Sequence, residues 1–250
     1  MRGTALPKRL MVSPNVETRA IGKPVDMLVL HYTGMADAER ACDWLCNSTA
    51  KVSCHYLVDM EGRITQMVDE DLRAWHAGVS SWAGEIDVNS RSIGIEIHNP
   101  GHAAGYPDFP PGQMAVVAQL CRDIVQRHKI APRRVLAHSD VAPGRKIDPG
   151  EKFDWAFLAE CGVGHWLSPA PIVDGRVLQT GDTGEAVSEL QQLLKQYGYN
   201  IENTGFYNDR TRVVLAAFQR HFRPAKVDGV ADLSTRETLK AVASTAAKTQ

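Results

Sequence analysis

A histidine, a lysine and an aspartate lie close together in one short stretch of the chain, residues 135–150. The apolar run at its start predicts a strand that ends at His138, and two later Pro-Gly steps predict a loop. If this loop is locally extended, it brings Lys146 and Asp148 back beside the histidine on one side of the backbone. Imidazole and carboxylate are zinc-ligand types, and a catalytic zinc site uses three protein ligands with one open position. The stretch therefore predicts two zinc ligands and requires a third elsewhere.

A second histidine, His31, follows the continuous apolar run 27–30, which predicts a strand covered on both faces. A lone histidine in such a place is more often a hydrogen-bonded residue at the edge of the core. Here another strand-end histidine and a nearby carboxylate favour the ligand interpretation, so His31 is the expected third ligand. His98, near the end of a later strand, is the rival.

The segment 92–99 predicts a strand whose isoleucines share one face, so that Gly94, Glu96 and His98 share the other. A glutamate inside an apolar strand is costly unless its face opens on a cleft or meets a charged partner. Glu96 is therefore a candidate general base. The alternative is an ordinary solvent-facing side chain on a one-sided sheet.

The segment 72–89 is polar, contains glycine and tryptophan and has no usable period. Such loops more often line a binding site than hold a core together. Trp75 and His76 are candidates for stacking on a ligand and hydrogen bonding to it, whereas Trp82 fits a ligand contact and a cover for apolar surface equally well. His55, inside an alternating strand, is interpreted as structural or as part of a groove wall.

The remaining elements are expected to position these residues. Residues 1–24 contain prolines and no sustained period, and we expect them to pack on the catalytic domain as extended chain. Strands and helices together predict an α+β catalytic domain over residues 25–161. Its further expected elements are helices at 36–47, 110–129 and 153–161 and a hairpin of strands at 53–59 and 64–68.

The C-terminal part has a different character. Residues 162–172 contain two glycines and two prolines and are interpreted as a linker. Apolar residues at helical spacing then predict a separate, all-α three-helix domain over residues 173–247, with helices at 184–196, 209–222 and 233–243. It is too small and too poor in convergent ionisable groups for catalysis.

Composition restricts the partners. A chain of 250 residues that is 44% hydrophobic can bury a core, and a formal charge of -1 argues against a nucleic-acid partner. No apolar run reaches the 18 or more residues of a membrane span. Protein partners stay unknown at this stage.

Localisation stays open. The five cysteines show no CxxC spacing, so buried free thiols are favoured over disulfides and the compartment is expected to be reducing. The N-terminus is basic and has no apolar h-region, so no secretory signal is visible, although numbering that starts after a removed leader would look the same.

Five motifs resemble the type-2 N-acetylmuramoyl-L-alanine amidases, a zinc-dependent family that is similar to peptidoglycan recognition proteins. They are Leu-His-Tyr-Thr at 30–33, Ser-Cys-His-Tyr-Leu-Val-Asp at 53–59, Ala-Trp-His-Ala-Gly at 74–78, Ser-Ile-Gly-Ile-Glu-Ile at 92–97 and His-Ser-Asp-Val-Ala-Pro-Gly-Arg-Lys-Ile-Asp-Pro-Gly at 138–150. The resemblance implies a mixed central β-sheet flanked by helices and one Zn²⁺ bound by His31, His138 and Asp148. It thereby favours His31 over His98. Some relatives have cysteine in place of Asp148, and the aspartate is typical of the bacterial cell-wall-recycling amidase and its envelope cousins.

The C-terminal domain is similar to the three-helix peptidoglycan-binding domain through its motifs at 181–184, 190–193 and 218–219. It departs from that pattern in a longer segment, residues 199–204. A wall-binding domain favours the cell envelope or periplasm, whereas the missing signal and the free cysteines favour the cytoplasm.

The resemblance implies hydrolysis, by zinc-activated water, of the amide between the lactyl group of N-acetylmuramic acid and L-alanine of the stem peptide. Glu96 would transfer the proton from water to the leaving amine, and Lys146 would stabilise the negative charge. The expected substrate, in peptidoglycan or muropeptide fragments, would contact Trp75, His76, Asn99 and Arg145. The alternative is a non-catalytic peptidoglycan receptor, and a zinc peptidase is disfavoured because no HExxH helix is present.

Overall fold

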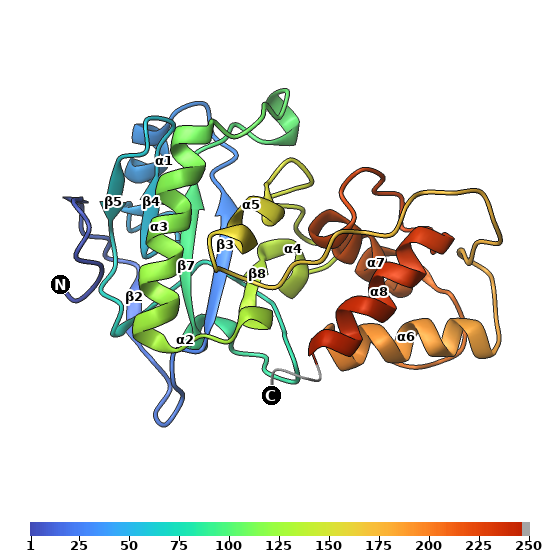
Figure 1. The fold of residues 1–250 in the computed structure, drawn as a ribbon. Coiled ribbons are helices and arrows are strands. Elements are labelled where there is room, and N and C mark those ends of the chain that lie inside the picture. Colours follow the sequence, from blue (N-terminus) through green and yellow to red (C-terminus); the bar gives the residue numbers. More distant parts are fainter. Residues whose placement is uncertain (247–250) are drawn as a thin grey trace.

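A six-stranded mixed sheet forms the centre of the computed structural model, which describes residues 1–246 (Figure 1). Strands β3, β7 and β8 run parallel, β4 runs parallel to β7, and β5 is antiparallel to β4. In order across the sheet the strands are β1 (Arg9–Leu10), β5 (Ile64–Gln66), β4 (Tyr56–Val58), β7 (Ser92–Ile97), β3 (Met27–Tyr32) and β8 (Val135–Ala137). The predicted α+β class with a mixed central sheet is confirmed.

Helix α3 (Pro111–His128) covers one face of this sheet (Figure 1). Side chains alternate along a strand, so Leu28 and Leu30 of β3 and the isoleucines of β7 point to this face and form one buried cluster with α3. His31 and Glu96 have the opposite parity. They therefore lie on the face that α3 does not cover.

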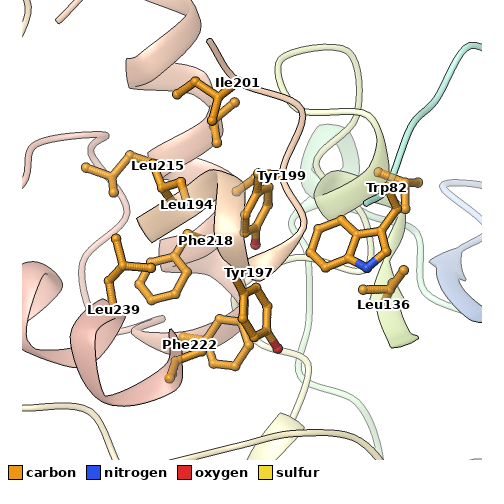
Figure 2. Packing of buried hydrophobic residues seen from close by; sticks show 14 of the residues in the cluster. Trp82, Leu136, Leu194, Tyr197, Tyr199, Ile201, Leu215, Phe218, Phe222 and Leu239 are labelled. Atoms are coloured by element: carbon orange, nitrogen blue, oxygen red, sulfur yellow. The ribbon is translucent and has the colours of Figure 1, made fainter. Parts of the chain in front are cut away.

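The C-terminal helices are α6 (Glu185–Tyr197), α7 (Asp209–Phe222) and α8 (Leu233–Ala246), and their apolar residues form a second buried cluster. Val29 and Leu136 of the sheet and Trp82 belong to the same buried cluster as the apolar residues of these helices. Figure 2 shows the Trp82 indole facing Tyr199 and Tyr197. The C-terminal helices thus share a hydrophobic core with the sheet. The sequence predicts a separate three-helix domain and does not predict this shared core.

The segment 72–89 differs from the expected structureless loop. It contains β6 (Leu72–Ala74) and the start of α2 (Val88–Arg91), and Trp82 is only 1% exposed. β6 pairs with β2 (Val16–Thr18), and β1 adds to the edge of the main sheet beside β5. The extended chain expected over residues 1–24 therefore contributes two short strands.

A single helical turn, α4 (His138–Val141), follows β8 and was not among the elements predicted from the sequence. The Asp140 carboxyl group accepts the backbone N–H of Ala137 at 2.8 Å, which caps this turn. The two Pro-Gly steps lie after this turn, in residues 142–150, which contain no helix, as the loop prediction expects. Of the other expected helices, α1 covers Ala38–Leu45 and α5 covers Trp155–Glu160.

All five cysteines are free thiols. Among residues 1–246, no helix has both the length and the apolar character that a membrane crossing requires. The expected end of the C-terminal domain at residue 247 lies outside the described residues.

Candidate metal and catalytic centre

The carboxyl ends of three parallel strands bring the candidate residues together. His31 of β3 is the register partner of Glu96 of β7, and Leu30 is the partner of Ala137, the last residue of β8. His138 comes directly after β8. Because parallel strands end at the same edge of a sheet, the three side chains meet at that edge.

Three possible ligand atoms converge there. The Nδ1 atoms of His31 and His138 lie 2.9 Å apart, and Asp148 Oδ2 lies 3.0 Å from His138 Nδ1 and 3.3 Å from His31 Nδ1. All three side chains are buried. The rival, His98, lies apart from this cluster, with its Nδ1 3.1 Å from the hydroxyl of Thr33.

A chain of hydrogen bonds sets the tautomer of His31. The Ser92 hydroxyl donates to the Val88 carbonyl at 2.7 Å, so it accepts from Nε2–H of His76 at 3.0 Å. His76 Nδ1 is then an acceptor, and it receives Nε2–H of His31 at 3.0 Å. The proton of the His31 ring therefore sits on Nε2, and the Nδ1 lone pair points to the cluster.

His138 has the same arrangement with a simpler partner. Its Nε2 lies 3.2 Å from the carbonyl oxygen of Ala77, to which it can only donate. This contact is shorter than the 3.4 Å between Nε2 and the Arg145 guanidinium, which itself donates to Ala77 and Val79. The remaining nitrogen, Nδ1, therefore offers its lone pair to the cluster. A metal-binding histidine is commonly oriented through its other ring nitrogen in this way.

The charge states also suit a metal ligand set. Burial, followed by the nearby His138, lowers the pKa of His31 to about 4, so its ring is neutral at pH 7. Burial would raise the pKa of Asp148, but the two histidines outweigh burial and hold it well below its ordinary value. A neutral His31 ring and an ionised Asp148 carboxylate meet the His138 ring at one point, an arrangement that a cation stabilises. The His-His-Asp triad can thus bind a metal ion, and its donor types fit zinc.

Glu96 stands beside the triad with one oxygen unused. Its Oε2 is covered and has no hydrogen-bond partner among the described residues. Burial, and next the charge of Asp148, raise the pKa of Glu96 well above its ordinary value, while Lys146 acts in the opposite direction. Such a carboxyl group takes up a proton more readily than an ordinary glutamate does, which suits an acid–base catalyst.

Glycine at position 94 explains how His76 fits behind this strand. A Cβ atom there would lie 2.5 Å from the His76 ring, which is closer than atoms can pack. The glycine that the strand pattern placed on the same face as Glu96 therefore makes room for the hydrogen-bonded imidazole.

A cavity of about 390 Å³ contains the triad together with Glu96 and Lys146. Its apolar wall includes Trp44 of α1, which is 49% exposed, and Val52. Neither wall residue is predicted from the sequence. For Trp44 a signal was present, since a large aromatic side chain lies on the polar side of the helix predicted at 36–47.

Three of the four predicted substrate contacts line the cavity, and Asn99 does not. Trp75 and Arg145 line the cavity, and Trp75 Nε1 is buried without a partner among the described residues. His76 also reaches the wall, but both of its ring nitrogens are used in the hydrogen-bond chain. Asn99 does not belong to the lining, because its amide group binds the Pro107 carbonyl and the Gly101 N–H, each at 2.9 Å. These two bonds hold the loop of Asn99, and its contact with substrate stays a prediction.

His55 has the structural place expected of it. Its Nδ1 accepts Gly94 N–H at 3.0 Å, and its Nε2 lies 3.1 Å from the Leu72 carbonyl. Burial lowers its pKa to about 3, so the ring is neutral. A larger cavity, about 850 Å³, shares Arg145 with the first but is otherwise lined by residues of 78–86, 141–143 and 200–210, away from the triad.

Comparisons with known proteins agree with this geometry. The family model described as N-acetylmuramoyl-L-alanine amidase matches residues 21–151, which include all three residues of the triad. The chain belongs to the N-acetylmuramoyl-L-alanine amidase family. Residues 183–239 match the peptidoglycan binding domain family. This amidase is 37% identical to the amidase AmiD of Escherichia coli over 231 residues, which cover 87% of this chain and 82% of that protein.

Solved structures extend the likeness to the fold. The complex of AmiD from E. coli with the substrate anhydro-N-acetylmuramic acid-L-Ala-D-gamma-Glu-L-Lys matches with a TM-score of 0.76 at 35% identity, over 92% of this chain and 93% of that one. AmpDh3 from Pseudomonas aeruginosa in complex with anhydromuramic pentapeptide gives a TM-score of 0.74 at 31% identity, over 94% and 98%. The predicted function is confirmed. This amidase is a hydrolase that cleaves the amide between the lactyl group of N-acetylmuramic acid and L-alanine.

Proposed function

We propose that this amidase works with one Zn²⁺ per chain, held by Nδ1 of His31, Nδ1 of His138 and the carboxylate of Asp148. The observation that carries the proposal is the convergence of these three atoms within 2.9 to 3.3 Å of one another, with both imidazole protons directed away. Zinc would supply Lewis-acid chemistry there, since it polarises a carbonyl group and makes water more acidic.

Glu96 is the proposed acid–base residue. As a carboxylate it accepts a proton from the attacking water while the new C–O bond forms at the scissile carbonyl. It then delivers that proton to the amide nitrogen, the C–N bond breaks, and L-alanine leaves as a free amine. The raised pKa of Glu96 supports this role because a carboxyl group that protonates readily can carry the proton between the two steps.

Lys146 is the residue proposed to stabilise the negative charge that forms on the scissile carbonyl oxygen during hydrolysis. Its side chain lines the same cavity as Glu96 and the triad. An ammonium group there would stabilise the oxyanion that develops on the carbonyl oxygen, an effect worth about 3 kcal/mol per donor in comparable sites.

We propose muropeptides or peptidoglycan as the substrate. The known complexes of AmiD and AmpDh3 contain anhydromuramic peptides, and the peptidoglycan binding domain supports contact with the wall polymer. Trp75 and Arg145 are the proposed contacts from the original set, joined by Trp44 on the apolar wall. His76 is better explained as a residue that orients His31.

The test is release of stem peptide from sacculi and from anhydro-muropeptides. The protein should release peptide in both assays or in one, and a chelator should stop release until zinc is restored. Glu96→Ala should keep about one zinc per chain and lose at least about a hundredfold in turnover. Near-normal turnover of this variant would remove Glu96 from the mechanism, and chelator-resistant release would contradict the zinc proposal.

A further inference from the structure

Helix α4 connects the proposed zinc ligands to one another. His138 is its first residue, and the next backbone N–H, that of Ser139, donates to the backbone carbonyl of Asp148 at 3.0 Å. The carbonyl of Ala142, directly after the helix, accepts the N–H of Lys146 at 3.0 Å. The orientation of this single turn therefore sets the positions of two ligands and of the catalytic lysine. A turn of four residues cannot hold that orientation by itself.

A buried carboxyl group of α4, that of Asp140, binds two residues of the C-terminal domain. Asp140, 1% exposed, accepts the Tyr199 hydroxyl at 2.6 Å and faces Nδ1 of His221 at 2.7 Å, in addition to its bond to the Ala137 N–H. Tyr199 and His221 both lie within the part of the chain that matches the peptidoglycan binding domain. One carboxyl group thus joins the metal-bearing turn to two elements of the other domain.

Packing fixes both of these partners. The His221 ring stacks on Trp155 of α5, with ring centres 3.8 Å apart. Tyr199 packs edge-on against Trp82 at 4.9 Å, as Figure 2 shows. Both partners are therefore held by side chains of the catalytic domain.

Two further contacts from α7 reach the loop after α4. The Arg210 guanidinium donates to the Pro143 carbonyl at 3.3 Å. Gly144 has a positive φ of 82°, and a Cβ atom there would lie 3.2 Å from the side chain of Val213. Glycine thus allows α7 to approach the backbone that leads to Lys146 and Asp148.

From these contacts we infer a second role for the peptidoglycan-binding domain: Tyr199 and His221 are positioning residues that hold α4, and with it His138 and Asp148, in the metal-binding geometry. The inference rests on the proposed zinc site. It also explains the segment 199–204, where the chain departs from the peptidoglycan-binding pattern. A domain that only binds the wall polymer does not need the bond between Tyr199 and Asp140. A domain that also holds α4 in place does need it.

The test compares two tyrosine-to-phenylalanine variants of the full-length protein. Tyr199→Phe removes the bond to Asp140 and keeps the ring. Tyr207→Phe is the matched control, because Tyr207 is equally buried and donates one hydrogen bond of 2.7 Å to the Gly229 carbonyl inside the C-terminal domain. Two properties are measured for each variant: zinc affinity, by competition with a chelator of known affinity, and hydrogen–deuterium exchange of the backbone amides in residues 137–148.

Tyr199→Phe should weaken zinc binding by about tenfold and speed exchange in 137–148 in the metal-free protein by a similar factor. Tyr207→Phe should change neither by more than about twofold. Equal behaviour of the two variants in both measurements would overturn the inference. If the wild-type protein binds no zinc, the proposed function is contradicted. The exchange data still show in that case whether Tyr199 holds α4.

Discussion

Replacing Ser92 by alanine should weaken zinc binding, although Ser92 is not a ligand. The serine hydroxyl orders the tautomers of His76 and His31, since it donates to the Val88 carbonyl and accepts Nε2–H of His76. In Ser92→Ala, that N–H loses its acceptor in a buried place, which costs about 1–3 kcal/mol. His76 avoids the cost by moving its proton to Nδ1.

That shift has a direct consequence for the metal. A proton on Nδ1 of His76 faces Nε2 of His31, only 3.0 Å away, so the proton of His31 must move to its own Nδ1. This is the nitrogen that the proposed zinc site uses. Zinc binding then has to restore the original tautomers, and the same 1–3 kcal/mol weakens the affinity by about 5- to 150-fold.

The assay is competition for zinc between the protein and a colorimetric chelator at pH 7, together with urea unfolding of the metal-free protein. The matched control is Ser139→Ala. Ser139 is equally buried and lies beside a ligand, but its hydroxyl has no hydrogen-bond partner among the described residues. Its removal should change the affinity by no more than about twofold. The reasoning is refuted if Ser92→Ala also binds zinc within about twofold of the wild type.

Two further predictions concern metal content and pH. Asp148→Ala should retain less than about 0.1 zinc per chain by inductively coupled plasma analysis, and full occupancy would remove Asp148 from the ligand set. Burial raises the pKa of Glu70, but hydrogen bonds from Arg127, His128 and Tyr56 outweigh burial and leave it well below its ordinary value. Because this folded-state pKa is depressed, the stabilisation is complete above the unfolded pKa of about 4.3 and is lost as pH falls through the folded value. Glu70→Gln should lower the free energy of unfolding by about 2–4 kcal/mol at pH 7 and by less at pH 3. A urea series that gives the same difference at both pH values would contradict this account.

The sequence by itself determined the elements whose pattern is local. The period of two in the strand 92–97 placed Glu96 opposite the buried isoleucines, and the burial of those isoleucines against α3 agrees. The apolar runs before His31 and His138 located the strand ends, and parallel pairing then required those ends to meet. Spacing had already grouped Asp148 with the histidines, and the family motifs added the choice of His31 over His98 and the activity.

Only the tertiary structure decided how these side chains are held. His76 looked like a ligand contact because it lies in a polar, aromatic segment, yet its partners His31 and Ser92 are set by packing across strands. The contact of Asp140 with the C-terminal domain had no local signal, since its partner Tyr199 is 59 positions away. Trp82 likewise joins the core of the C-terminal helices. Periodicity reports which face of an element is buried, whereas hydrogen-bond partners and tautomers depend on which distant elements cover that face.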